Sequence, residues 1–157
     1  MNRLMLMVIA GSMAMVSGTS VAEQAKIERL NPDTMPKSPF KSQAVVVDNA
    51  GKFVHIAGET AVATNFHVQG DTLDGQLTDA LQNFDYALAA AKSDRDHVVA
   101  LNVFFVAKSG EEPKTITPRL QAYFKDHGYP AVTFIGTPAL VAPGMLIEIE
   151  GTATVPN

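Results

Sequence analysis

The sequence contains no cysteine, and this absence excludes several kinds of site at once. Disulfide bridges, thiolate nucleophiles, iron–sulfur clusters and cysteine-ligated zinc all need that side chain. A lipid anchor attached through an N-terminal cysteine is excluded for the same reason. The chain also lacks Gly-X-Y repeats, heptad repeats and low-complexity tracts. Fibrous and disordered classes are therefore excluded, and an ordinary globular chain remains.

Clusters of basic residues are also missing. The 12 lysines and arginines are scattered singly, and the net charge is −4. Nucleic-acid binding needs a basic surface that follows the phosphates, so we expect no nucleic-acid partner. The 157 residues suffice for one domain, and the 46% of them that are apolar suffice for a packed core.

The N-terminus carries the longest apolar run of the chain. Arg3 precedes an apolar stretch over residues 4–16, and Ser20 and Ala22 place small residues where a signal peptidase reads. The run is shorter than the ~20 apolar residues of a membrane span. The pattern predicts a signal peptide over residues 1–22, cut after Ala22, and a periplasmic or secreted protein without stable membrane insertion after cleavage. An uncleaved N-terminal anchor is the alternative.

The rest of the chain alternates between strand and helix patterns. Residues 23–38 hold prolines and predict an extended lead-in before a domain at 39–157. Two β-forming runs at 43–48 and 53–58, joined through a glycine-containing turn, predict a hairpin. From Thr72, large apolar residues recur at three- and four-residue spacing, which predicts an amphipathic helix. The remaining expected elements are a strand at 97–106, a helix at 115–126 and strands at 131–136 and 145–155.

This order of elements, β-β-α-β-α-β-β, predicts an α+β domain with both helices on one face of a single mixed sheet. In the last strand, Ile147 and Ile149 point to one face while Glu148 and Glu150 point to the other. The face away from the helices then needs cover. A symmetric oligomer is an economical way to supply it.

Several segments match, in order, the motifs of a known family. They are Pro39–Val45, Val54–Glu59, the helix positions Gln76, Ala80, Leu81, Asn83 and Leu88, then Val98–Val99, Val103–Phe104 and Leu146–Gly151. Together they resemble the Rid family, also called YjgF or enamine/imine deaminase-like, over roughly Pro39 to Val155. The resemblance implies a chorismate-mutase-like fold assembled as a homotrimer, with small-molecule clefts between subunits.

Where this family is catalytic, it hydrolyses reactive 2-imino acids to 2-keto acids and ammonia. The resemblance implies that the arginine of a P-A-R motif holds the substrate carboxylate through two hydrogen bonds. A glutamate, matched here by Glu148, then holds the attacking water. The P-A-R segment reads Pro130-Ala131-Val132 in this chain, so the carboxylate clamp is missing.

The resemblance also implies which residues line the ligand cleft. Besides the catalytic candidate Glu148, they are Phe40, Lys41, Gly58, Glu59, Val132, Thr133 and Phe134. Phe40 stands where the family often has a tyrosine, and Lys41 or a cation of a neighbouring subunit is the candidate to replace the arginine. Phe40 and Phe134 either line the cleft or pack in the core. The glutamate pair at 148 and 150 is either an acid/base pair or a pair of solvated carboxylates.

These departures from the family pattern predict a small-molecule-binding protein with little or no imine deaminase activity. The alternative is an enamine/imine deaminase that works by an arginine-independent variant of the family mechanism. RNA cleavage, a third class found in the family, is disfavoured by the acidic balance and the signal peptide. With Val132 facing the cleft, Val132→Arg is expected to restore part of the rate of imine hydrolysis.

The four histidines lack the spacing of metal ligands, so we expect no metal and no cofactor.

Overall fold

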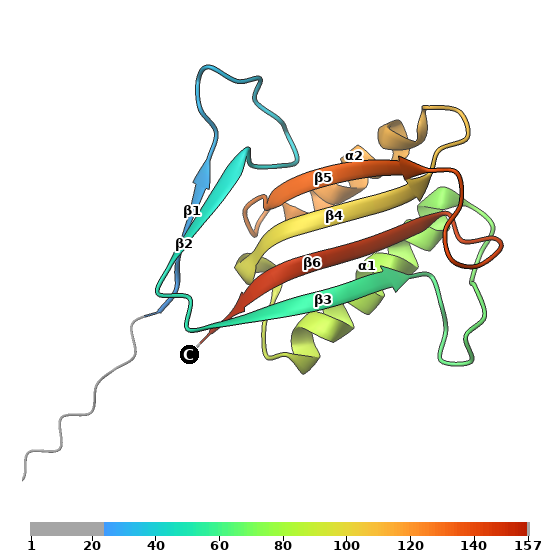
Figure 1. Ribbon diagram of the computed structural model, residues 1–157, viewed down its shortest axis with the longest axis horizontal. Helices are drawn as coiled ribbons and strands as arrows, with labels where there is room; N and C mark the ends of the chain where they lie inside the picture. The colour runs from blue at the N-terminus through green and yellow to red at the C-terminus, as the bar shows by residue number, and fades with distance from the viewer. Residues whose placement is uncertain (1–23, 157) are drawn as a thin grey trace, which may run out of the picture.

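The computed structural model describes residues 24–156 (Figure 1). Its elements are β1 (Lys26–Leu30), β2 (Ala44–Asp48), β3 (Lys52–Thr60), α1 (Leu73–Ala90), the short 3-10 helix η1 (Arg95–His97), β4 (Val98–Val106), α2 (Glu112–Phe124), β5 (Ala131–Thr137) and β6 (Ile147–Val155). The expected signal peptide over residues 1–22 lies outside the described residues. Between residues 24 and 156, no helix combines the length and apolar character needed to cross a membrane.

A four-stranded sheet in the order β3-β6-β4-β5 forms one layer, and both α-helices lie on one of its faces (Figure 1). Strands β4 and β5 run parallel, whereas β6 runs antiparallel to both β3 and β4. The predicted α+β fold, with two helices on one face of a mixed sheet, is confirmed. Strand β4 lies inside the sheet, as its continuous apolar run indicated.

Helix α1 forms where the spacing of apolar residues predicted it. Thr72 caps its N-terminus, because the Thr72 side-chain hydroxyl accepts a hydrogen bond from the Gly75 amide at 3.2 Å. Leu77 and Phe84 on the sheet-facing side of the helix are fully buried, as is Ile149 on β6. Each such side chain contributes roughly 1.5–3 kcal/mol of burial free energy. The core therefore lies between the helices and one face of the sheet.

The predicted hairpin between residues 43–48 and 53–58 is wrong. Both runs form strands, but β2 pairs with β1 and β3 pairs with β6. Asn49 and Gly51, with φ angles of 54° and 61°, turn the chain from the small sheet into the large one. Strand β1 also replaces part of the expected lead-in. It precedes the first proline of that segment, so every residue in it keeps the N–H that pairing requires.

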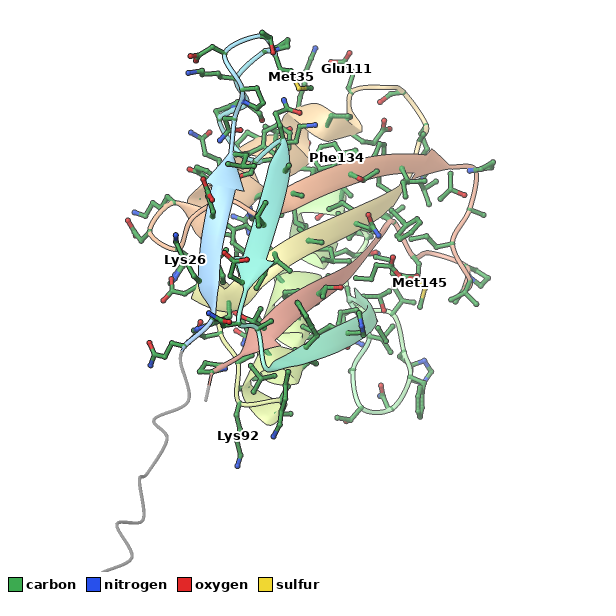
Figure 2. All side chains as sticks on the ribbon, turned by 60° about the vertical axis from the view of Figure 1, so that its left-hand side comes forward. Lys26, Met35, Lys92, Glu111, Phe134 and Met145 are labelled. Atoms are coloured by element: carbon green, nitrogen blue, oxygen red, sulfur yellow. The ribbon has the colours of Figure 1, made fainter. Side chains whose placement is uncertain are left out.

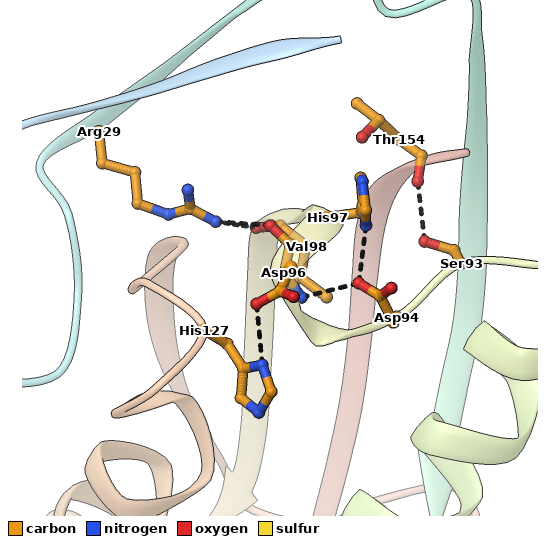
Figure 3. Close-up of polar contacts among 8 residues, drawn as sticks. All are labelled: Arg29, Ser93, Asp94, Asp96, His97, Val98, His127 and Thr154. Atoms are coloured by element: carbon orange, nitrogen blue, oxygen red, sulfur yellow. Dashed lines mark hydrogen bonds and ion pairs between the residues drawn. The ribbon is translucent and has the colours of Figure 1, made fainter. Parts of the chain in front are cut away.

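The β1–β2 hairpin is attached to the main sheet at the beginning of β5 (Figure 2). The Ser42 amide donates to the Pro130 carbonyl at 2.8 Å. Arg29 of β1 donates through Nη2 to the Asp96 carbonyl at 2.9 Å (Figure 3). His127, just after α2, lies with its Nδ1 2.9 Å from Asp96 Oδ1. The hairpin, η1 and the end of α2 therefore meet at one corner of the molecule.

Helix α2 begins three residues before the expected start at residue 115. Pro113 lies in its first turn, where the missing N–H has no intrahelical partner to lose. Pro118 lies inside the helix. A proline is compatible with either a turn or a helix start, so Pro113 alone does not fix the first residue of the helix.

Glu112 fixes the loop before α2 and makes stability depend on pH. Its Oε1 accepts from the backbone amides of Ser109 at 2.9 Å and Lys108 at 3.0 Å, and from the Ser109 hydroxyl at 2.9 Å. These bonds, led by the Ser109 amide, lower the pKa of Glu112 from 4.5 to about 2. The folded pKa lies below the unfolded one, so the stabilisation is fully present above pH 4.5 and is lost as the pH falls toward 2.

We expect Glu112→Gln to flatten this acid dependence. Urea unfolding of the wild type, measured at a series of pH values from 5 down to about 2, should show a falling midpoint that the variant shows less steeply. Glu111→Gln is the matched control, because Glu111 is the exposed neighbouring glutamate. Equal slopes for the wild type and Glu112→Gln would contradict the assignment.

Candidate functional site

A cleft of about 760 Å³ opens at the edge of the sheet, where β3 ends and β6 begins. Gly58 and Glu59 of β3 and Glu148 of β6 form its floor. Its walls come from α1 and from the loops that follow β3 and precede β6. The structure therefore brings three of the sequence-predicted site residues together.

Gly58 makes room for the Glu148 carboxylate. The pairing of β3 with β6 is irregular between Ile56 and Glu59, and this places Gly58 against the Glu148 side chain. A Cβ atom at position 58 would lie 2.0 Å from Glu148 Oε1. Any residue larger than glycine would force the carboxylate to move. The glycine thus belongs to the site rather than to a turn.

The floor of the cleft is acidic. Glu59 and Glu148 line it, and the lining contains no lysine, arginine or histidine. Burial raises the pKa of Glu59, and no hydrogen bond or nearby cation offsets that effect. Within one subunit, the cleft lining therefore offers no cationic side chain to a carboxylate ligand.

Val132 lies in the hydrophobic core, on the other side of the sheet from Glu148. It is 7% exposed and pairs in register with Leu101 of β4, which is also buried. Side chains alternate along a strand, so the exposed Thr133 occupies the opposite face. Within one subunit, the residue that matches the family's arginine in sequence therefore faces the helices and does not line the Glu148 cleft.

The other expected cleft residues lie at the opposite edge of the sheet. Phe40 and Phe134 stack with ring centroids 5.3 Å apart, and Phe134 also meets Phe105 edge-to-face at 6.2 Å. Lys41 is half-buried and is not among the residues that line the cleft. Three strand spacings, about 14 Å, separate β5 from β3. Figure 2 accordingly shows Phe134, on β5, apart from Met145, a cleft residue in the loop before β6.

The described arginines are committed to contacts elsewhere. Arg29 donates to the Asp96 carbonyl (Figure 3). Arg95 binds Asp85 through both Nε and Nη2, and Arg119 Nε lies 3.3 Å from the Asp74 carboxylate. Between residues 24 and 156, no arginine therefore replaces the missing clamp within one subunit.

Two amide side chains of α1, which the sequence did not single out as site residues, hold the cleft walls. Gln76 is fully buried; its Nε2 donates to the carbonyls of Gly70 at 3.1 Å and Gly144 at 2.7 Å, and its Oε1 accepts from the Leu146 amide at 2.8 Å. Asn83 donates through Nδ2 to the Thr60 carbonyl at 2.8 Å. The sequence signal that could have marked Gln76 is an amide side chain within the apolar stripe of a helix, because a buried amide needs hydrogen-bond partners. Both loops beside the cleft are thus fixed to one helix.

The rim of the cleft carries exposed apolar side chains that sequence reasoning also missed. Phe66, Tyr86 and Val141 are 89%, 64% and 88% exposed, and all three line the cleft. Phe66 and Val141 lie in loops, where no periodic pattern marks a residue as a site residue.

As for metals, no cluster of three or more histidine, aspartate or glutamate side chains able to hold an ion occurs in the described part of the chain.

The fold and the edge cleft define a two-layer α+β protein of the kind that the sequence motifs resemble. A sequence model described as endoribonuclease L-PSP matches residues 33–155. A solved structure, YyfB from Yersinia pestis, described as a protein of unknown function of the conserved Rid family, shares 34% identity over 82% of this chain and 98% of its own, with a TM-score of 0.76. The chain belongs to this family, Rid/YjgF, whose sequence model carries the endoribonuclease L-PSP description.

More distant structures share the fold. A YjgF-family protein from Neisseria meningitidis is 21% identical over 84% of this chain and 97% of its own, with a TM-score of 0.58. A YjgF-family member from Mycobacterium tuberculosis is 26% identical over 83% of this chain and 100% of its own, with a TM-score of 0.55. Comparison with curated proteins gives no match.

Proposed function

We propose that this Rid-family chain binds small molecules in the cleft around Glu148 and has little or no imine deaminase activity. The observation that carries the proposal is the absence of a cationic side chain from the cleft lining within one subunit, which holds two carboxylates instead. A 2-imino acid substrate brings a carboxylate of its own. Without a cationic partner for this carboxylate, the substrate loses about 1.5–3 kcal/mol of binding free energy, which corresponds to at least about a tenfold loss of affinity.

The same acidic lining disfavours RNA as a substrate. An RNA chain carries one negative phosphate per nucleotide, and binding it requires lysine or arginine along its path. Glu59 and Glu148 would repel it. The deaminase remains the alternative function, because Glu148 could still hold a water molecule for attack on an imine carbon.

A homotrimer is part of the proposal. The sheet face away from the helices carries Phe104 and Ile135, which are only partly covered within one subunit, beside Glu150 and its hydrogen-bond partner Asn102. Cover from further copies of the chain would shield the apolar residues and bring other groups near the cleft.

Export to the periplasm or beyond, with cleavage after Ala22, is also proposed, from the pattern of residues 1–22 alone.

We expect the purified chain not to accelerate imine hydrolysis. A 2-imino acid generated by an amino-acid oxidase should decay at the same rate without protein, with the wild type and with Glu148→Gln. A Rid-family deaminase with an intact P-A-R motif is the positive control. Acceleration by the wild type that is lost in Glu148→Gln would establish the alternative function instead.

A further inference from the structure

We infer that the cleft takes a ligand that carries a cationic ammonium group on an apolar body. This inference rests on the proposed function, because it names the chemistry of the small molecule that the cleft would bind. Three features carry it: the charge of the floor, the character of the rim and the way in which the walls are held.

Two carboxylates, those of Glu59 and Glu148, line the cleft. In the pairing of β3 with β6, Glu59 lies opposite the buried Ile149 and Thr60 lies opposite Glu148, so the two carboxylates reach the cleft from opposite faces of the sheet edge. Burial raises the pKa of Glu59, as expected for a carboxylate without a cation beside it. A cation that enters the cleft gains charge-assisted hydrogen bonds, whereas an anion is repelled.

The rim supplies an apolar and partly aromatic surface. Phe66, Tyr86 and Val141 are exposed large side chains that gather around this one cleft. Such a gathering differs from apolar residues scattered singly over a surface, which need no explanation. Aromatic faces also attract ammonium groups. Met145, beside them, is a flexible side chain that adapts to ligands of varied shape.

The walls are held before any ligand arrives. Gln76 connects the loop after β3 to the loop before β6, and Asn83 fixes the end of β3. A site that is already ordered loses less conformational entropy on binding. The negative floor and the apolar rim therefore keep their relative positions.

Three probes that share a benzene ring test the charge preference. They are 2-phenylethylammonium, 2-phenylethanol and phenylacetate, titrated into the purified chain by calorimetry at neutral pH. We expect the ammonium compound to bind at least about tenfold more tightly than the alcohol, and phenylacetate to bind most weakly. Equal affinities for the ammonium compound and the alcohol, or tighter binding of phenylacetate, would overturn the inference and leave small-molecule binding in place.

Absence of binding by all three probes would also overturn the inference. The proposed function fails on a different result, which is imine hydrolysis that depends on Glu148. Calorimetry therefore tests the ligand class, and the imine-hydrolysis assay separately tests the proposed function.

Charge-neutral variants locate the effect. Glu59→Gln and Glu148→Gln should each weaken binding of the ammonium compound by about tenfold and leave the alcohol unchanged. Glu28→Gln is the matched control, since Glu28 is exposed on β1 and does not line the cleft. Gly58→Ala is a second probe, because the added methyl group displaces the Glu148 carboxylate. An unchanged preference in both glutamine variants would contradict the assignment.

Discussion

Replacing Val132 by arginine is expected to unfold the domain rather than to create a substrate clamp. Val132 is 7% exposed among core residues, and its neighbour Leu101 offers no partner for a guanidinium. A buried charge without a partner costs several kcal/mol, and the larger side chain adds overpacking. We expect a loss of at least about 3 kcal/mol in the free energy of unfolding, measured by urea denaturation.

Thr133→Arg is the matched control for this substitution. Thr133 is adjacent in sequence but exposed on the other face of β5, so the same charge there should change the free energy of unfolding by no more than about 0.5 kcal/mol. If Val132→Arg folded as stably as Thr133→Arg, the side chain at position 132 would have to reach solvent. Imine hydrolysis gained by such a stable Val132→Arg protein would support the cleft position that the sequence motif implied.

Replacing Gln76 by methionine is expected to loosen both walls of the cleft. Methionine keeps most of the side-chain volume but leaves the carbonyls of Gly70 and Gly144 and the amide of Leu146 without their partners. Each buried polar group left unpaired costs about 1–3 kcal/mol, so a total loss of about 2–4 kcal/mol in the free energy of unfolding is expected after partial relaxation.

Hydrogen exchange separates loosening of the walls from general destabilisation. The Leu146 amide should exchange faster in Gln76→Met by a larger factor than amides in the centre of β4. Gln82→Met, on the exposed face of the same helix, is the control and should change neither stability nor exchange appreciably. Uniformly faster exchange across the sheet would show that Gln76 supports the whole core and not specifically the cleft walls.

The sequence predicted the elements that its periodicity marks strongly. Helix α1 and strand β4 lie where the three-to-four-residue spacing and the continuous apolar run placed them. Strand pairing was harder to predict, because two β runs joined by a short turn favour a hairpin only when no other partner competes. Here β2 pairs with β1, and β3 pairs with β6.

The face occupied by Val132 shows how two kinds of sequence reasoning diverged. The motif match placed this residue in the cleft, yet the local alternation of Val132, Thr133 and Phe134 already favours apolar side chains on one face and the threonine on the other. The structure follows the alternation, because burial of apolar surface decides which way a strand faces. Gly58 and Glu148, which the sequence analysis assigned to one site, lie against each other on the neighbouring strands β3 and β6. The loop residues of the rim had no such pattern.

The antiparallel pairing of β3 with β6 also determines where a label or linker can be attached without covering the cleft. Val155 pairs with Lys52, at the beginning of β3, whereas Glu148 lies beside Thr60, at its end. Seven residues of extended strand, roughly 20 Å, separate the carboxyl-terminal end of β6 from the cleft. A fluorophore or surface linker attached after Val155 would therefore leave the acidic opening unobstructed, and immobilised protein could be used to screen amines directly.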